Sequence, residues 1–135
     1  MAALTFIDAN VLAYAYDADS GAKGEGAREI LAEIDGAVVS TQVVLELFAV
    51  LTRKLGLTRD DADAAIEALM DLEVVTTDAR LVREGLRISR DHDISHWDAM
   101  IIAAAVMSGC DVLLTEDLND GQVIEGVRVV NPFPA

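Results

Sequence analysis

The chain has 135 residues, about the length of one domain, and carries 24 acidic against 10 basic residues for a net charge of −14. Such a charge ordinarily argues against nucleic acid as a ligand, although a carboxylate-rich site can bind phosphodiesters through metal ions. The single cysteine, Cys110, excludes an intramolecular disulfide. No apolar stretch reaches the roughly 18 residues of a membrane span, and the N-terminus lacks the basic region of a secretory signal. We therefore expect one cytoplasmic domain over residues 1–135, with no membrane association.

Short apolar runs alternate with longer helical patterns along the chain, which is typical of a parallel α/β fold. We predict five strands, at residues 4–7, 37–40, 73–75, 112–115 and 127–130. Helices are predicted at residues 8–16, 23–34, 41–55, 59–72, 79–91 and 96–109, the last three capped by Thr58, Asp78 and Ser95. The strands are continuous apolar runs, as expected of strands buried on both faces, and this favours a sheet with helices on each side.

Four acidic residues stand where a solvated surface charge is not expected, two just beyond predicted strands and two within apolar helices. They are Asp8, Glu46, Asp98 and Asp117. Parallel sheets bind ligands beyond the carboxyl ends of their strands, where strand order reverses. If strands 4–7 and 112–115 are neighbours at that point, Asp8 and Asp117 converge there. Carboxylates gathered without matching bases repel one another unless a divalent cation neutralises them, so the sequence predicts a metal site.

Each acid taken alone also has a structural explanation. Asp8 could cap the following helix, Asp98 could be a first-turn acid favoured by the helix dipole, and Asp117 could belong to a polar turn. Glu46 is harder to explain, because no base lies within helical reach of it and glutamate is rarely buried unless paired. The joint placement of the four acids favours a functional site.

Other chemistries find less support in the sequence. His92 and His96 have the spacing of zinc ligands on a helix, but a helix break is predicted between them and no third histidine or cysteine pair supports zinc. A nucleophile elbow and a glycine-rich phosphate loop are both missing. A phosphoaspartyl phosphatase would need a second aspartate where Asn10 stands, and a site lysine. Neither Lys23 nor Lys54 is near a late strand end in sequence.

Four arginines recur at spacings of three, four and three residues, so one face of the predicted helix carries them all: Arg80, Arg83, Arg87 and Arg90. Two interpretations remain open. The arginines form either a solvated surface paired with Glu84 and Asp91 or a strip that contacts phosphates.

Taken together, four segments of the chain resemble PIN-domain ribonucleases, specifically VapC-type toxins of toxin–antitoxin pairs. The segments are residues 6–12, 40–46, 95–105 and 113–118, and the ending at 130–133 is also typical. Each segment alone is a loose match, whereas the four in this order and at these spacings are specific. The resemblance spans nearly the whole chain.

The resemblance implies a three-layer α/β/α sandwich around a five-stranded, mostly parallel sheet. It also implies that the four acids are catalytic and bind metal, with Asn10 and Thr115 as supporting polar groups. Mg²⁺ or Mn²⁺ suits such hard oxygen ligands. Asp8 and Asp98 are the first choices for direct ligands, while Glu46 and Asp117 bind a second ion or act through water.

The function implied is that of a metal-dependent endoribonuclease toxin, which hydrolyses RNA with a metal-activated water. A homodimer and a cognate VapB-type antitoxin are implied as well, and the arginine strip then becomes a candidate RNA-binding surface. A non-cleaving PIN-fold binding module, acting as the partner of a regulator, is the main alternative; a phosphoaspartyl phosphatase is another.

Overall fold

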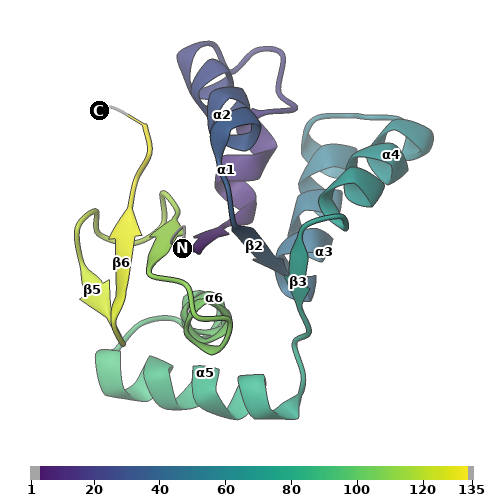
Figure 1. The fold of residues 1–135 in the computed structure, drawn as a ribbon. Coiled ribbons are helices and arrows are strands. Elements are labelled where there is room, and N and C mark those ends of the chain that lie inside the picture. Colours follow the sequence, from purple (N-terminus) through teal and green to yellow (C-terminus); the bar gives the residue numbers. More distant parts are fainter. Residues whose placement is uncertain (1–3, 134–135) are drawn as a thin grey trace.

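The computed structural model describes residues 4–133, which build a six-stranded sheet in the order β3-β2-β1-β4-β6-β5 (Figure 1). The strands are β1 (Thr5–Ile7), β2 (Ala37–Ser40), β3 (Glu73–Val75), β4 (Val112–Leu114), β5 (Val123–Ile124) and β6 (Val127–Val130). Every adjacent pair is parallel except β5 and β6, which pair antiparallel. The predicted α/β fold with a mostly parallel sheet is thus confirmed, with β5 as an additional strand.

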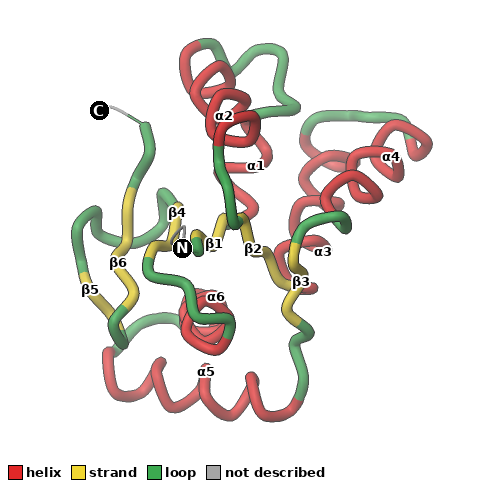
Figure 2. Tube along the Cα trace, viewed as in Figure 1, coloured by secondary structure: helices red, strands yellow, loops and turns green. Residues whose placement is uncertain are grey.

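Helices cover both faces of this sheet (Figures 1 and 2). They are α1 (Ala9–Tyr14), α2 (Ala22–Glu33), α3 (Thr41–Ala49), α4 (Arg59–Leu69), α5 (Ala79–His92) and α6 (His96–Met107). One face carries α1 to α4 and the other carries α5 and α6, which gives the expected three layers. None of the helices between residues 4 and 133 has the length and apolarity to cross a bilayer.

The predicted helix at 41–55 changes its hydrogen bonding near its end. After α3 the chain continues as a π-helical turn, η1 (Val50–Lys54). The apolar periodicity extends through both pieces, so the sequence could not reveal the change. The predicted caps are present: the side chains of Thr58, Asp78 and Ser95 each accept a hydrogen bond from the backbone N–H three residues on.

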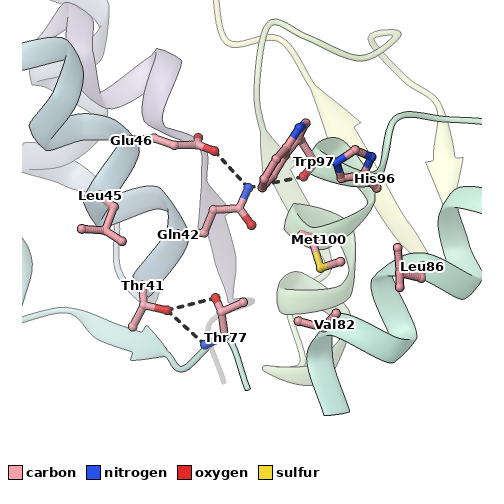
Figure 3. A pocket seen from close by; sticks show the side chains of 10 residues that line it. All are labelled: Thr41, Gln42, Leu45, Glu46, Thr77, Val82, Leu86, His96, Trp97 and Met100. Carbon is pink, nitrogen blue, oxygen red and sulfur yellow. Dashed lines mark hydrogen bonds between the residues drawn. The ribbon is translucent and has the colours of Figure 1, made fainter. Parts of the chain in front are cut away.

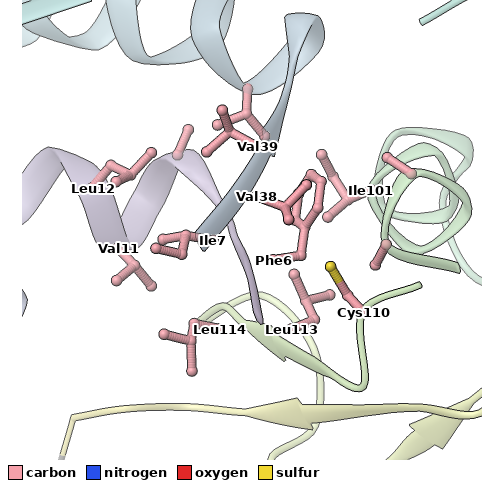
Figure 4. Packing of buried hydrophobic residues seen from close by; sticks show 14 of the residues in the cluster. Phe6, Ile7, Val11, Leu12, Val38, Val39, Ile101, Cys110, Leu113 and Leu114 are labelled. Carbon is pink, nitrogen blue, oxygen red and sulfur yellow. The ribbon is translucent and has the colours of Figure 1, made fainter. Parts of the chain in front are cut away.

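The core fills both interfaces between the sheet and its helices (Figure 4). Phe6 and Leu113 lie toward Ile101 of α6, whereas Ile7 lies toward Val11 of α1. All five side chains are buried. Alternate residues of the same strand therefore anchor opposite layers, which explains why these strands are apolar without interruption.

The order of the strands reverses between β1 and β4. From β1 the sheet continues through β2 to β3, and from β4 it continues in the opposite direction through β6 to β5. The register of this central pair aligns Ile7 with Leu114. Asp8 follows β1 at once, and its backbone N–H donates to the Leu114 carbonyl at 3.0 Å. The two strands are therefore neighbours that end at the same level, which is the condition under which Asp8 and Asp117 were expected to converge.

Close packing of α5 on α6 depends on Gly85. A Cβ atom added at this glycine would lie 2.5 Å from Met100 Sδ and 3.3 Å from Met100 Cα. A side chain at this position would displace the flexible end of Met100 and press on its backbone, so glycine favours the close approach of the two helices.

Candidate active site

Asp8 lies at the centre of the candidate site and is only 6% exposed. It caps α1: its Oδ1 accepts a hydrogen bond from Ala9 N at 2.7 Å. Its Oδ2 accepts a second hydrogen bond from the Thr115 hydroxyl at 2.8 Å. Both the capping interpretation and the buried position predicted for Asp8 are therefore correct, and the cap fixes the carboxylate at the switch point of the sheet.

The Thr115 hydroxyl connects three parts of this edge. Besides donating to Asp8, its oxygen accepts hydrogen bonds from Asn10 Nδ2 at 3.3 Å and from Asp117 N at 3.1 Å. Thr115 is 1% exposed, so its hydroxyl is shielded from water. The other amide atom of Asn10, Oδ1, is buried and has no hydrogen-bond partner among the described residues. Asn10 and Thr115, the two expected supporting residues, thus contact each other beside Asp8.

Glu46 lies on α3 and is half-buried, less enclosed than its apolar neighbours in the sequence suggested. Its Oε1 accepts a hydrogen bond from Gln42 Nε2 at 3.0 Å. The same Gln42 amide donates to the Trp97 carbonyl at 3.4 Å, which links α3 to the first turn of α6 (Figure 3). Gln42 was not singled out from the sequence, although its position one turn before Glu46 could have indicated this contact.

The remaining two acids are more accessible than Asp8. Asp98 is half-buried in the first turn of α6, where its backbone N–H donates to the Ser95 cap at 3.1 Å. Asp117 is exposed in the segment after β4, where its backbone N–H is held by Thr115. The expectation that all four acids occupy sheltered positions is therefore correct for Asp8, correct in part for Glu46 and Asp98, and wrong for Asp117.

The acids influence one another electrostatically. Burial raises the pKa of Asp8 from 3.8 to about 6, although the hydrogen bonds from Thr115 and Ala9 lower it, and the charges of Glu46 and Asp117 raise it further. Burial also raises the pKa of Asp98; the Ser95 hydrogen bond opposes this rise and the Asp117 charge adds to it. The charge of Asp117 therefore raises the pKa of both Asp8 and Asp98, whereas that of Glu46 raises the pKa of Asp8.

The residues fit a divalent cation in charge and ligand type. Among residues 4–133, none of the four acids takes part in an ion pair with a base. Carboxylate oxygens and the unpartnered Asn10 Oδ1 are hard donors of the kind that Mg²⁺ and Mn²⁺ prefer. In the same range, however, no three His, Cys, Asp or Glu side chains are close enough to hold one ion together. Binding would thus require the acidic side chains to move closer.

Lys23 approaches this edge of the sheet, where no lysine was expected from the sequence. Lys23 Nζ, on α2, lies 2.7 Å from Glu116 Oε2 and 3.4 Å from Tyr14 Oη. Burial would raise the pKa of Glu116, but the hydrogen bonds from Lys23 and Tyr14 outweigh it and lower the pKa. Neither lysine was expected near a late strand end, and for Lys23 this was wrong. The pair ties α2 to the segment that carries Asp117.

The four arginines of α5 differ in their surroundings. Arg87 contacts three carboxylates, those of Glu84, Asp91 and Glu125, and so joins α5 to the β5–β6 turn. Arg90 has one long contact, at 3.7 Å to Asp91, and Arg80 and Arg83 have no ion pair among the described residues. The expected pairing with Glu84 and Asp91 is confirmed for Arg87.

The two histidines take part in different contacts. His92 Nε2 lies 3.4 Å from Glu125 Oε2, on the side of the β5–β6 turn. The His96 ring packs against Trp97 with 4.7 Å between ring centroids. As predicted, α5 ends at His92 and α6 begins only at His96, so the spacing of the pair is not that of one continuous helix.

These features define a doubly wound α/β protein with a group of uncompensated acids at the switch point of its sheet. The family model of the PIN domain matches residues 5–120, a range that includes all four acids. The chain therefore belongs to the PIN-domain family. No curated protein matches it in sequence.

Solved structures with the same fold come from toxin–antitoxin systems. A toxin–antitoxin complex from Klebsiella pneumoniae superposes with a TM-score of 0.73 at 20% identity, covering 97% of this chain and 99% of that one. VapC20 of Mycobacterium tuberculosis, described as a toxin that cleaves the sarcin-ricin loop, gives 0.70 at 22% identity, with 84% and 89% covered. DNA-bound VapBC from Salmonella typhimurium gives 0.69 at 21% identity, with 95% and 97% covered. At these identities, the fold is what the chain shares with them.

Proposed function

We propose that this chain is a metal-dependent endoribonuclease, the cytoplasmic toxin of a type II toxin–antitoxin pair. The observation that carries the proposal is the buried Asp8 at the switch point of a PIN fold, where the charges of Glu46 and Asp117 raise its pKa and no base among residues 4–133 forms an ion pair with it. Such an edge stabilises cations and repels the phosphates of RNA unless a cation lies between them.

Each acid has a distinct role in this proposal. Asp8 and Asp98 would hold the ion directly, while Glu46 and Asp117 would bind a second ion or act through water. A divalent cation held there would supply the positive charge needed to activate a water for attack on the phosphodiester and to stabilise the leaving oxygen. The Thr115 hydroxyl orients the Asp8 carboxylate by donating to Oδ2.

The partners of the chain are proposed on the basis of the fold. Neighbours at TM-scores of 0.73 and 0.69 were solved as complexes with antitoxins, which supports a VapB-type antitoxin as the cognate partner here. With a net charge of −14, the chain would attract a basic segment of such a partner. RNA as the substrate and a homodimer as the assembly are part of the same proposal.

One observation favours the alternative, a non-cleaving module that retains the fold and partners a regulator. The described acids do not form a group of three that could hold one ion, so the chain could use this edge for binding alone. The phosphoaspartyl alternative has less support, because the lysine at this edge pairs with Glu116 rather than with Asp8.

Cleavage of RNA by the purified chain, with Mg²⁺ or Mn²⁺ and with EDTA, separates these functions. We expect cleavage with either ion, none in EDTA, and none by Asp98→Asn. The matched control is Asp111→Asn, which removes a charge from an exposed position and should cut normally. Mapping the 5′ ends of cleaved RNA after induced expression identifies the substrate. Cleavage by Asp98→Asn at the wild-type rate, or undiminished in EDTA, contradicts the proposal.

A further inference from the structure

Glu116 directly precedes Asp117 in the segment after β4, and its carboxylate is held by a distant part of the chain. Lys23 Nζ, on α2, donates to Glu116 Oε2 at 2.7 Å, across 93 positions of sequence. The side chain of Glu116 is 20% exposed and that of Lys23 is 44% exposed, so water screens the pair only in part. The pair therefore anchors a segment whose next residue is a proposed catalytic acid.

Further contacts hold the Lys23 ammonium in place. It also donates to Tyr14 Oη of α1 at 3.4 Å, and it lies 5.0 Å from the centroid of the Tyr14 ring and 5.8 Å from that of Phe133. The two rings pack edge to face with 5.2 Å between centroids, and Phe133 is buried. These distances are within the range of cation–π attraction. Lys23 is thus held by α1 and by the chain after β6 as well as by Glu116, which makes it a firm anchor.

Asp117 depends on such an anchor because its own side chain has none. Within residues 4–133, the Asp117 carboxylate makes no hydrogen bond or ion pair. Its backbone N–H donates to the Thr115 hydroxyl two residues earlier, which closes a local turn with Glu116 at its centre. The turn is held on one side by Thr115, which is bonded to Asp8, and on the other by Glu116. These two contacts therefore determine where the Asp117 carboxylate lies.

We propose that the Lys23–Glu116 pair positions Asp117 beside Asp8 and Asp98 and thereby sets the affinity of this edge for a divalent cation. The charge of Asp117 raises the pKa of both of these acids, so its carboxylate lies within electrostatic reach of them. Lys23 and Glu116 are positioning residues in this inference and act on the ion only through Asp117. The inference rests on the proposed function, because it gives Asp117 a role in metal binding.

A purely electrostatic role of Lys23 predicts the opposite result. A positive charge near the acids repels a cation, so its removal alone would tighten metal binding. Positioning predicts weaker binding, because Asp117 loses its anchor. Lys23→Met removes the ammonium and keeps an unbranched apolar side chain, so the sign of the change in affinity distinguishes the two roles.

Binding of Mn²⁺ to the purified full chain, followed by the electron paramagnetic resonance signal of the free ion, measures this sign. We expect Lys23→Met to bind Mn²⁺ about 10-fold more weakly, the lower end of the range for residues that orient metal ligands. Lys54→Met is the matched control: Lys54 is the only other lysine, is exposed and has no ion pair among the described residues. This control should bind at least as tightly as the wild-type protein. Unchanged or tighter binding by Lys23→Met overturns the inference.

A double-mutant cycle tests whether the effect passes through Asp117. In the Asp117→Asn background, Lys23→Met should change the Mn²⁺ affinity by less than about 2-fold, because the group that it repositions no longer carries a charge. Equal weakening in both backgrounds would mean that Lys23 acts independently of Asp117, which contradicts the inference. Lys23→Arg retains a charged donor for Glu116 and should recover most of the affinity. An arginine variant as weak as Lys23→Met contradicts a role of the ion pair.

Amide hydrogen exchange in EDTA tests the positioning without metal. The Asp117 N–H bonds to the Thr115 hydroxyl, so its exchange reports on opening of the turn. Lys23→Met should exchange this amide faster than Lys54→Met and the wild-type protein do, with the capped Leu81 N–H of α5 unchanged as an internal reference. Equal protection of the Asp117 amide in all three proteins overturns the inference.

The two proposals fail in different ways. A wild-type protein that binds no Mn²⁺ and cuts no RNA contradicts the proposed function, and with it the metal-binding part of this inference. A wild-type protein that binds Mn²⁺ and cuts RNA, with both properties unchanged in Lys23→Met, removes only the positioning role of the Lys23–Glu116 pair.

Discussion

The Thr115 hydroxyl donates a hydrogen bond of 2.8 Å to the carboxylate of Asp8, a residue 107 positions earlier in the chain. Both residues are almost fully buried, at 1% and 6% exposure. The bond stabilises the ionised form of Asp8 and so opposes the effect of burial on its pKa. It also sets the orientation of the carboxylate that we propose as a metal ligand.

Thr115→Val keeps the shape of the side chain and removes this donor. We expect the free energy of unfolding at pH 7.5 to fall by about 1.5–3 kcal/mol, as for a hydrogen bond to a charged group. The pKa of Asp8 should rise above about 6, which NMR titration of its carboxyl carbon would measure. Thr115→Ser retains the hydroxyl and should cost only the buried methyl, about 0.8 kcal/mol. Equal losses in the two variants would show that the hydroxyl does not stabilise Asp8.

Asp8→Asn should stabilise the protein in EDTA. Burial raises the pKa of the folded state from 3.8 to about 6, so the contribution of Asp8 to stability is fully present below pH 3.8 and is lost as pH rises through 6. A shift of this size corresponds to about 3 kcal/mol. Allowing for a poorer hydrogen bond to Thr115, we expect a net gain of about 2 kcal/mol at pH 7.5, measured by urea denaturation.

The pH dependence of this gain provides its control. Asp8→Asn and the wild-type protein should converge well below pH 3.8, where Asp8 is protonated in both the folded and the unfolded state. Asp111→Asn, at an exposed position, should show little gain at either pH. Unchanged or lower stability of Asp8→Asn at pH 7.5 would show that burying the ionised Asp8 carboxylate does not destabilise the folded state. Added Mg²⁺ should raise the Tm of the wild-type protein more than that of Asp8→Asn, because a ligand that binds only the folded state stabilises it.

Two helical glycines should respond oppositely to alanine. At Gly85 the new Cβ would overlap Met100, at 2.5 Å from Sδ, and we expect a loss of about 1–3 kcal/mol from overpacking. At Gly26 the nearest atom, on Phe133, lies at an ordinary 3.6 Å. Alanine there should therefore add about 0.5–1 kcal/mol through its higher helix propensity. Thermal unfolding of both variants measures the difference; a stable Gly85→Ala would mean that the Met100 side chain and α6 adjust without cost.

The arginines of α5 should divide into two groups. Arg83→Glu removes a charge that is free of ion pairs among the described residues, so it should leave the Tm unchanged. If Arg83 contacts a phosphate, the slope of log K for RNA binding against log salt concentration should become shallower by about 1. Arg87→Glu should lower the Tm, since it would bring a fourth carboxylate against Glu84, Asp91 and Glu125. Arg128→Glu makes the same charge change on β6 and is the control for net charge. RNA binding with the same salt slope in Arg83→Glu and the wild-type protein would leave the strip as a solvated surface.

Local sequence signals predicted much of the fold because the interactions behind them are local. The caps at Thr58, Asp78 and Ser95 bond within their own first turns, and the strand predicted at 73–75 matches β3, where two adjacent valines follow Glu73. The short strand β5 escaped prediction, since two residues carry no periodicity and pair only through the antiparallel turn to β6. The π-helical turn after α3 was missed for a similar reason, because its apolar pattern continues that of the helix.

By itself, the sequence determined the alternation of strands and helices, the four acids and their likeness to one nuclease family. Apolar runs, caps and unpaired carboxylates are all visible in the order of the residues. Only the tertiary structure decided which groups meet: Asp8 with Thr115, Lys23 with Glu116, Gln42 with both Glu46 and Trp97. It also decided how much water reaches each acid, from buried Asp8 to exposed Asp117. Burial and long-range contact depend on how the layers pack, and the pKa of each carboxylate depends in turn on both.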